Sequence, residues 1–367
     1  MKSLSKRLAE KLDHRAADGT LRSVSYSKGL VDFYSNDYLS LAKLRVDTSE
    51  ELFSGTGSRL ISGTSTSALD CEQSVAGFFG YAAALFFNSG YDANLGLFSS
   101  IPQKGDTVLY DRDIHASIRD GIRLSHASSF SFKHNDIEDL ERLLDKQHGG
   151  DIYVAVESLY SMKGDIAPLE QLAKLTDRFG AYLIVDEAHG AGVLGKNGKG
   201  MVHEFALQDQ VLAQVTTFGK AFGAHGAAVL GNNLLRTYLI NFARSFIYTT
   251  ALPPHSYLRV NEILSRTDLE NRRIKLLRNI SLLRSLLPKA FACSYEYSPI
   301  QIIHFRDREK LDSVARKMQQ NGFGVKAIFS PTVPESEECL RINLHTDNTE
   351  EEIRRLADQL NSALLKD

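Results

Sequence analysis

Cysteine is scarce in this chain of 367 residues, which contains only three. Cys71, Cys293 and Cys339 lie far apart, so they predict neither a disulfide framework nor a metal site, and they suit a reducing cytoplasm. A basic excess is also absent, because the formal net charge is −2. That balance gives no indication of a nucleic-acid or membrane partner. Long apolar runs are missing too, so no bilayer-spanning segment is expected.

The N-terminus has the pattern of an amphipathic helix, with Leu4, Leu8 and Leu12 spaced four residues apart among basic side chains. We expect this helix to lie on the body of the protein. An organelle transit peptide is the alternative. Glu10 and Asp13 interrupt the basic pattern, and no cleavage site follows, so the alternative is disfavoured.

Short apolar runs alternate with helical patterns through the middle of the chain. The runs predict strands at 83–87, 107–110, 129–132, 152–156, 182–185, 211–217 and 227–230. Helical patterns such as 137–144 and 169–179 separate them. This alternation predicts an α/β domain with a mostly parallel sheet of about seven strands.

The pattern changes near residue 253, where two long helical stretches begin and run to residue 287. Shorter strand and helix patterns follow, which indicate a smaller α+β domain. We therefore expect three parts: an N-terminal segment (1–45), a large domain (46–255) and a small C-terminal domain (256–367).

Lys220 stands in a stretch of small residues, 216–226, directly after an apolar run. Glycines beside it would let the backbone approach a flat ligand closely. Lysine amines form Schiff bases with carbonyl cofactors, and partial burial makes them more nucleophilic. An ordinary loop lysine fits this stretch equally well, so the rest of the chain must decide.

Polar residues follow several predicted strands, at the sheet edge where α/β folds bind ligands. Small residues at 88–94 open a helix that suits a phosphate, or simply a helix cap. His115 can stack on an aromatic cofactor or be structural. Asp186 ends an apolar run and needs a cationic partner, such as a protonated pyridine nitrogen, and His189 can reach the same ligand. The polar cluster 157–165 is explained by a turn.

The segment 186–196 also contains patterns typical of nucleotide-binding proteins. Asp-Glu-Ala-His is a helicase signature, and the glycines from Gly190 to Lys196 fit both a phosphate loop and a dinucleotide fingerprint. However, Asn197 stands where a magnesium-binding hydroxyl is required, and no strand–helix–strand unit surrounds the glycines. We therefore reject a nucleotide site here.

Several motifs occur together in one order: 35–39, Gly57-Ser58-Arg59, 186–190, 217–220 and 246–254. Each is weak alone, but the ordered set resembles the α-oxoamine synthases, a family of fold-type-I pyridoxal 5′-phosphate (PLP) enzymes, and covers nearly the whole chain. The runs 186–195 and 246–251 look most like the alanine-using members that serve biotin biosynthesis. The resemblance implies a cytoplasmic homodimer with shared active sites.

The resemblance also implies a role for each candidate residue. Lys220 would hold PLP covalently and move a substrate proton, Asp186 would keep the pyridine nitrogen protonated, and His115 would stack on the ring. Further cofactor contacts are implied for Gly90, Tyr91, Ser161, His189 and Thr217, with Thr249 and Thr250 reaching in from a partner subunit. Substrate contacts are implied for Asn36, for Arg341 with the amino-acid carboxylate, and for Arg22 with the acyl substrate.

The implied reaction is a decarboxylative condensation of L-alanine with a pimeloyl thioester of coenzyme A or acyl-carrier protein. Glycine with acetyl-CoA, or serine with a long acyl chain, is the alternative within the family. A non-catalytic protein of the same fold is the alternative outside it, which Lys220 disfavours. The chain departs from the family at Ser40, where glycine is usual, and in the acidic loop 334–339.

Overall fold

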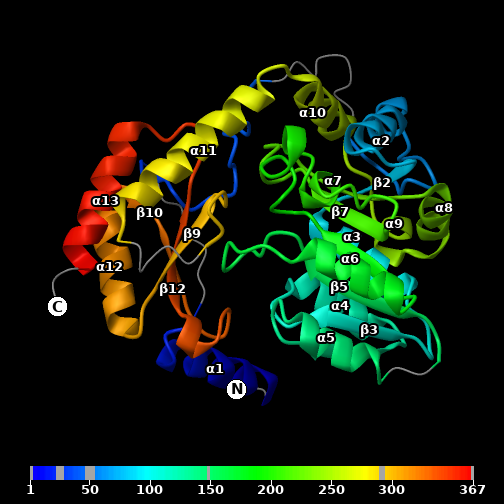
Figure 1. The fold of residues 1–367 in the computed structure, drawn as a ribbon, viewed down its shortest axis with the longest axis horizontal. Coiled ribbons are helices and arrows are strands. Elements are labelled where there is room, and N and C mark those ends of the chain that lie inside the picture. Colours follow the sequence, from blue (N-terminus) through cyan, green and yellow to red (C-terminus); the bar gives the residue numbers. More distant parts are fainter. Residues whose placement is uncertain (1–2, 22–28, 46–53, 147–148, 289–293, 365–367) are drawn as a thin grey trace.

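The computed structural model describes residues 3–21, 29–45, 54–146, 149–288 and 294–364. Figure 1 shows two lobes, one coloured cyan to green and the other yellow to red. Arg22 lies outside the described residues, so its predicted contact with the acyl substrate stays a prediction. None of the described helices is long and apolar enough to cross a membrane.

The first lobe is built on a seven-stranded sheet, which confirms the predicted α/β fold with its mostly parallel sheet. The strand order is β2-β8-β7-β6-β5-β3-β4, and only β8 runs antiparallel to its neighbours. The strands are β2 (Ala83–Phe87), β3 (Thr107–Asp111), β4 (Ser128–Phe132), β5 (Ile152–Glu157), β6 (Tyr182–Asp186), β7 (Val211–Thr217) and β8 (Ala227–Gly231).

Helices cover both faces of this sheet, which explains why most of its strands have continuous apolar runs. Val154 and Val156 of β5 enter one apolar core, while Tyr153 and Ala155 enter the other. The helices are α2 (Thr66–Phe79), α3 (Gly90–Ser100), α4 (Ala116–Leu124), α5 (Ile137–Leu144), α6 (Leu169–Arg178), α7 (Met201–Glu204), α8 (Asn233–Phe242) and α9 (Arg244–Ile247), with a 3-10 turn at η1 (Lys196–Gly198).

The second lobe contains an antiparallel three-stranded sheet in the order β11-β12-β9, covered by long helices (Figure 1). Its elements are α11 (Leu269–Leu286), β9 (Ile300–His304), α12 (Arg308–Gln320), β10 (Phe323–Gly324), β11 (Lys326–Ile328), η3 (Glu335–Glu337), β12 (Cys339–Asn343) and α13 (Glu350–Leu364). The helix before them, α10 (Pro254–Ser265), lies against α2 of the first lobe. The second lobe has the predicted α+β arrangement. The domain boundaries at 45 and 255 stay a prediction.

The N-terminal segment joins the second lobe through the backbone. Strand β1 (Val31–Asp32) pairs in parallel with β10, and the Asn343 N–H donates to the Phe33 carbonyl at 2.8 Å. Ser40, at the position where glycine was expected, has a φ of 52°. Its hydroxyl accepts a hydrogen bond from the Asp347 N–H at 3.0 Å, which offsets part of the cost of the left-handed backbone.

The predicted N-terminal helix is present as α1 (Ser3–Ala17), but its expected packing on the body of the protein is wrong for this chain. Leu8 and Leu12 are 52% and 55% exposed. Spacing alone shows that one face of a helix is apolar, but it does not show what covers that face.

His134, just after β4, joins three segments of the first lobe. Its Nδ1 lies 2.9 Å from Asp111 at the end of β3, and its Nε2 lies 2.7 Å from Asp165 in the turn after β5. Burial alone would lower the pKa of His134. The hydrogen bonds to the two carboxylates outweigh burial and raise that pKa to about 9. The charged imidazole therefore holds the ends of these segments together at neutral pH.

We predict that His134→Gln costs more stability at about pH 6 than at about pH 10, by about 2–3 kcal/mol. The raised pKa makes the contribution of His134 complete below its unfolded pKa and removes it as pH rises through about 9. Urea unfolding followed by circular dichroism at both pH values measures the difference. His126→Gln is the control, because His126 is exposed. An equal cost at both pH values would contradict the charged state of His134.

Candidate active site

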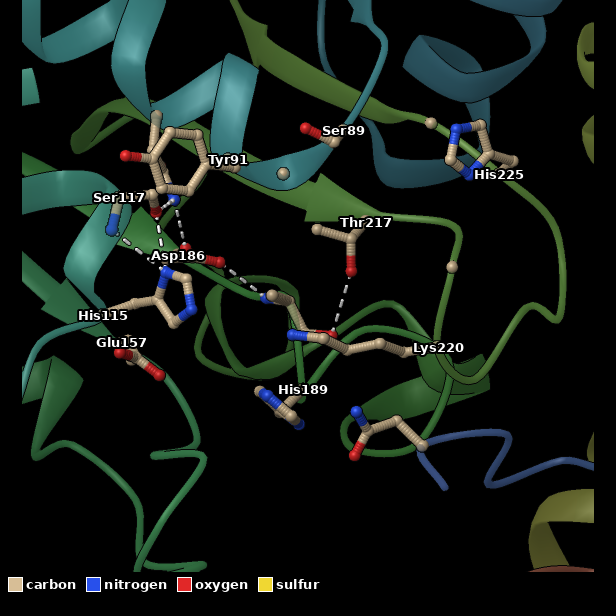
Figure 2. Close-up of a pocket in the computed structure, with 16 residues that line it drawn as sticks. Ser89, Tyr91, His115, Ser117, Glu157, Asp186, His189, Thr217, Lys220 and His225 are labelled. Atoms are coloured by element: carbon tan, nitrogen blue, oxygen red, sulfur yellow. Dashed lines mark hydrogen bonds between the residues drawn. The ribbon is translucent and has the colours of Figure 1, made fainter. Parts of the chain in front are cut away.

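A cavity of about 300 Å³ lies beyond the carboxyl ends of β5, β6 and β7, beside the start of α3. The structure brings eight of the predicted site residues to its wall: Asn36, Gly90, Tyr91, His115, Asp186, His189, Thr217 and Lys220. Figure 2 shows the Lys220 side chain extending across this cavity, toward the side where Asp186, His115 and Glu157 lie.

Asp186 is held rigidly at the end of β6, where it is 5% exposed. Its Oδ1 accepts from the Ala188 N–H at 2.8 Å, and its Oδ2 accepts from Asn94 Nδ2 of α3 at 2.8 Å. Both bonds fix the carboxylate at the cavity wall without neutralising it. A cationic ring nitrogen in the cavity would complete this environment.

Lys220 follows β7, and burial lowers the pKa of its amine to about 8, against the opposing effect of Asp186 and Glu157. About a tenth of the amine is therefore neutral and nucleophilic at pH 7, far more than for an ordinary lysine. Thr217, at the end of β7, donates from Oγ1 to the Ala188 carbonyl at 3.3 Å. The amine has the reactivity that Schiff-base formation requires.

The glycines around Lys220 differ in what surrounds them. Gly219 lines the cavity, and a Cβ on it would meet only the Ala224 carbonyl, at 3.7 Å, among the described residues, so the close approach of a flat ligand there stays a prediction. Gly223 has a φ of 56°, and a Cβ on it would lie 2.3 Å from the Ala42 nitrogen. The glycine at 223 therefore serves close packing against the N-terminal segment.

His115 is the N-cap of α4 and is linked to Asp186 by hydrogen bonds. Its Nδ1 accepts from the Ser117 N–H at 3.2 Å, which places the ring proton on Nε2. Asn94 Nδ2 donates both to Ser117 Oγ at 3.0 Å and to Asp186. Burial lowers the pKa of His115. A neutral imidazole in a fixed orientation suits stacking on an aromatic ring.

The N-terminus of α3 supplies a site for an anion. Ser89 caps this 11-residue helix, and the free N–H groups of its first turn lie at the cavity wall. A Cβ on Gly90 would lie 2.5 Å from Thr217 Cγ2, so only glycine fits there. The Tyr91 hydroxyl donates to Asp120 at 2.6 Å. Because that hydroxyl is already engaged, Tyr91 would bind an anion through its backbone N–H, which lies in the first turn of α3.

Glu157, at the end of β5, is a site residue that the sequence analysis missed. It lines the cavity, is 3% exposed, and its Oε1 has no hydrogen-bond partner among the described residues. Burial raises its pKa, and Asp186 acts in the same direction. The argument used for Asp186, an acid that ends an apolar run, would have found it. The turn interpretation of 157–165 concealed it.

His189 is fixed by a second residue that the analysis missed. The buried Tyr38 hydroxyl lies 2.8 Å from His189 Nδ1. Burial raises the pKa of Tyr38 to about 12 and lowers that of His189 well below its usual value. The Tyr38 hydroxyl donates its proton to Asn36 Oδ1 at 3.2 Å. His189 is held at Nδ1 by the same hydroxyl and presents its Nε2 side to the cavity as a neutral ring.

The glycines after His189 wrap a buried carboxylate. Glu187 accepts from the Ser158 hydroxyl and from the Val202 N–H, the latter at 2.7 Å. A Cβ on Gly190 would lie 2.2 Å from Glu187 Oε2, and one on Gly200 would lie 2.6 Å from its Cδ. The glycine spacing that imitates a phosphate loop is explained by packing, because a Cβ on Gly192 would lie 2.6 Å from Ala221 Cβ and one on Gly195 would lie 2.1 Å from the Gly200 carbonyl oxygen.

Four other predicted residues lie outside the cavity wall. Arg341 is 8% exposed and donates to the Ser161 carbonyl at 2.9 Å and to Asn36 Oδ1 at 3.3 Å, so it lies next to the cavity. Thr249 Oγ1 and the Thr250 carbonyl accept from Asn88 Nδ2, at 3.1 and 2.9 Å. Neither threonine reaches the cavity of its own chain.

These features together fit one cofactor. PLP needs an amine for its aldehyde, a carboxylate for its pyridine nitrogen, a flat neighbour for its ring and N–H donors for its phosphate. Lys220, Asp186, His115 and the start of α3 offer these around one cavity at the end of a mostly parallel sheet. The class that this fold and site define is the PLP-dependent enzymes of fold type I.

Comparison with known proteins gives the family. The model for aminotransferase class I and II matches residues 28–360. The 8-amino-7-oxononanoate synthase of Emericella nidulans is 38% identical over 365 residues, covering 90% of this chain and 88% of that protein. The chain belongs to the aminotransferase class I and II family and, within it, to the α-oxoamine synthases, acyl-transferring enzymes that use PLP.

Solved structures agree with this assignment. Serine palmitoyltransferase from S. paucimobilis, which contains PLP joined to myriocin, superposes with a TM-score of 0.89 at 27% identity, covering 99% of this chain and 98% of that one. The 8-amino-7-oxononanoate synthase of Francisella tularensis superposes with a TM-score of 0.76 at 32% identity, covering 92% and 98%.

Proposed function

We propose that this enzyme condenses L-alanine with a pimeloyl thioester, with loss of carbon dioxide and release of the thiol, to give 8-amino-7-oxononanoate for biotin biosynthesis. The observation that carries the proposal is the 32–38% identity to enzymes of that name over about nine-tenths of the chain, joined to a cavity whose residues fit PLP. The carrier is coenzyme A or an acyl-carrier protein.

The residues divide the chemistry between them. PLP, when bound, supplies an electron-withdrawing ring. Asp186 would hold the proton on the pyridine nitrogen, and the His115 imidazole would stack on the ring. Lys220, with its pKa lowered to about 8, binds the cofactor and then moves the α-proton of the amino acid. His189, oriented by Tyr38, contacts the phenolic side of the ring, where we also place Ser161.

We assign binding of the amino-acid substrate to two residues beside the cavity, Arg341 of β12 and Asn36 of the N-terminal segment. Arg341 would hold the amino-acid carboxylate as a bidentate fork, with Asn36 orienting its guanidinium at 3.3 Å. The serine palmitoyltransferase likeness keeps serine with a long acyl chain as the alternative, and glycine with acetyl-CoA is a further one.

Two variants test the roles of Lys220 and Asp186. Borohydride reduction of the yellow holoenzyme, followed by peptide mapping, should label Lys220 and should label nothing in Lys220→Ala. Label on another lysine would refute the assignment of Lys220.

Asp186→Asn should keep the label but lose at least about 100-fold in turnover, because an amide cannot hold the pyridine nitrogen protonated. Near-normal turnover in Asp186→Asn would make Asp186 a structural acid.

We further propose a homodimer in which Thr249 and Thr250 act in the partner's site, since neither lines the cavity of its own chain. The neighbouring Tyr248 is 71% exposed, which leaves an aromatic surface for a partner. The test mixes subunits of Lys220→Ala with subunits of a Thr249→Val/Thr250→Val double variant.

Each parent should be impaired, and the mixed dimer should regain activity, because one of its two sites then has both the lysine and the threonines intact. Sedimentation should give a dimer. A monomer with full activity, or mixed dimers that regain nothing, would contradict shared sites.

Substrate choice is tested with pimeloyl and heptanoyl thioesters, each with L-alanine, by following thiol release. A site built for the distal carboxylate should prefer pimeloyl by about 10-fold or more in kcat/KM, because its polar partner is otherwise left unpaired. Glycine in place of alanine is a weak discriminator, since one methyl group is worth only ~1–3 kcal/mol. Equal rates with heptanoyl, or faster rates with acetyl-CoA and glycine, would exclude the biotin-pathway reaction.

A further inference from the structure

A second cavity, of about 860 Å³, adjoins the active site, and we call it the side cavity. It lies between the segment 112–119, the turn 160–163 and the segment 330–337. His115 lines both cavities. Ser161, whose carbonyl accepts from Arg341, lies on the wall of the side cavity. A substrate in the side cavity would therefore meet the cofactor site beside both His115 and Arg341.

The wall of the side cavity is partly apolar, with Ile114, Met162, Val333 and Pro334 on it. Ile114 and Val333 are 4% and 7% exposed, so the lining is continuous with the packed interior. Such a wall suits an alkyl chain.

The wall of the side cavity has one more positively charged side chain than negatively charged ones. Lys163 Nζ lies 2.7 Å from Asp113 and 3.0 Å from Glu337, and Arg112 lies 3.5 Å from each of the same two carboxylates. The acidic loop 334–339 thus places Glu337 opposite two cations. Arg119 is the remaining cation on the wall, and it has no carboxylate partner among the described residues.

The Arg119 side chain is also held in place, although its hydrogen-bond donors have no acceptor among the described residues. Its guanidinium carbon lies 6.0 Å from the centre of the Tyr110 ring. Its Nε is buried and has no hydrogen-bond partner among the described residues. A guanidinium with a free fork at the edge of an apolar cavity binds a carboxylate with two parallel hydrogen bonds.

We propose that Arg119 binds the distal carboxylate of a dicarboxylic acyl thioester, a proposal that rests on the proposed function. Arg119 lies one helical turn beyond His115 on α4, so their Cβ atoms are about 5–6 Å apart. A seven-carbon chain spans roughly 7 Å between its ends, given C–C bonds of about 1.5 Å. With the thioester carbonyl beside His115, the far carboxylate comes within reach of the guanidinium.

The test compares kcat/KM for pimeloyl and heptanoyl groups, each as the coenzyme A and the N-acetylcysteamine thioester. In Arg119→Gln the pimeloyl values should fall about 10- to 100-fold on both carriers, while the heptanoyl values change less than about twofold. Arg119→Lys should recover part of the loss, because it keeps the charge but not the fork. Arg123→Gln is the matched control, on the same helix but 76% exposed and paired with Asp120.

The other outcomes are distinguishable. A loss confined to the coenzyme A thioesters, equal for both acyl groups, would assign Arg119 to the carrier's phosphates and overturn the proposal. A pimeloyl preference that survives in Arg119→Gln would overturn the proposal and leave the proposed function standing. A wild-type enzyme without that preference would contradict both. The spectral change on adding L-alanine reports an intact site in each variant, and Arg119→Met replaces Arg119→Gln if that variant loses it.

Discussion

The buried carboxylate of Asp186 is the constraint on which the site depends. A charged acid at 5% exposure is tolerated only where hydrogen bonds and a cation compensate for lost water. Asn94 and the Ala188 N–H provide the bonds, and Asn94 extends the same network through Ser117 to His115. One amide thus fixes the orientation of both Asp186 and His115 at the cavity wall. The acidic potential also opposes the loss of the proton from Lys220, so it is burial, helped by the charge of Arg341, that brings that pKa down.

Much of the fold could be predicted from the sequence, because buried parallel strands leave continuous apolar runs. Six strands of the large sheet, and the position of Asp186 at the end of one, follow from that pattern. The edge strand β4 is exposed except at Phe132, so it is not a buried apolar run. Glu157 ends a neighbouring run but lies in a polar cluster that also reads as a turn. Local sequence cannot distinguish a buried acid at a cavity from a polar turn residue, because the two differ only in which distant segments surround the side chain.

Other features depend on contacts between distant segments, which no local pattern contains. Gly223 is required by Ala42, and the fixed orientation of His189 comes from Tyr38, both far away in sequence. The exposed Leu8 and Leu12 show the opposite case, in which a clear local pattern does not predict the surface it faces. The free charge of Arg119 became visible only when the partners of Arg112 and Lys163 were known.

The pairing of β1 with β10 has a consequence for how the molecule is made. Residues 31–32 meet residues 323–324, and the Asn36–Arg341 contact closes an equally long loop. Contacts of such high sequence separation form late in folding, because the entropy of closing the loop must be met first. The cofactor-binding sheet ends at residue 231, so all of its strands leave the ribosome well before Arg341 does. During synthesis, the wall of the cavity that the sheet provides can therefore assemble before the strand that carries Arg341 exists.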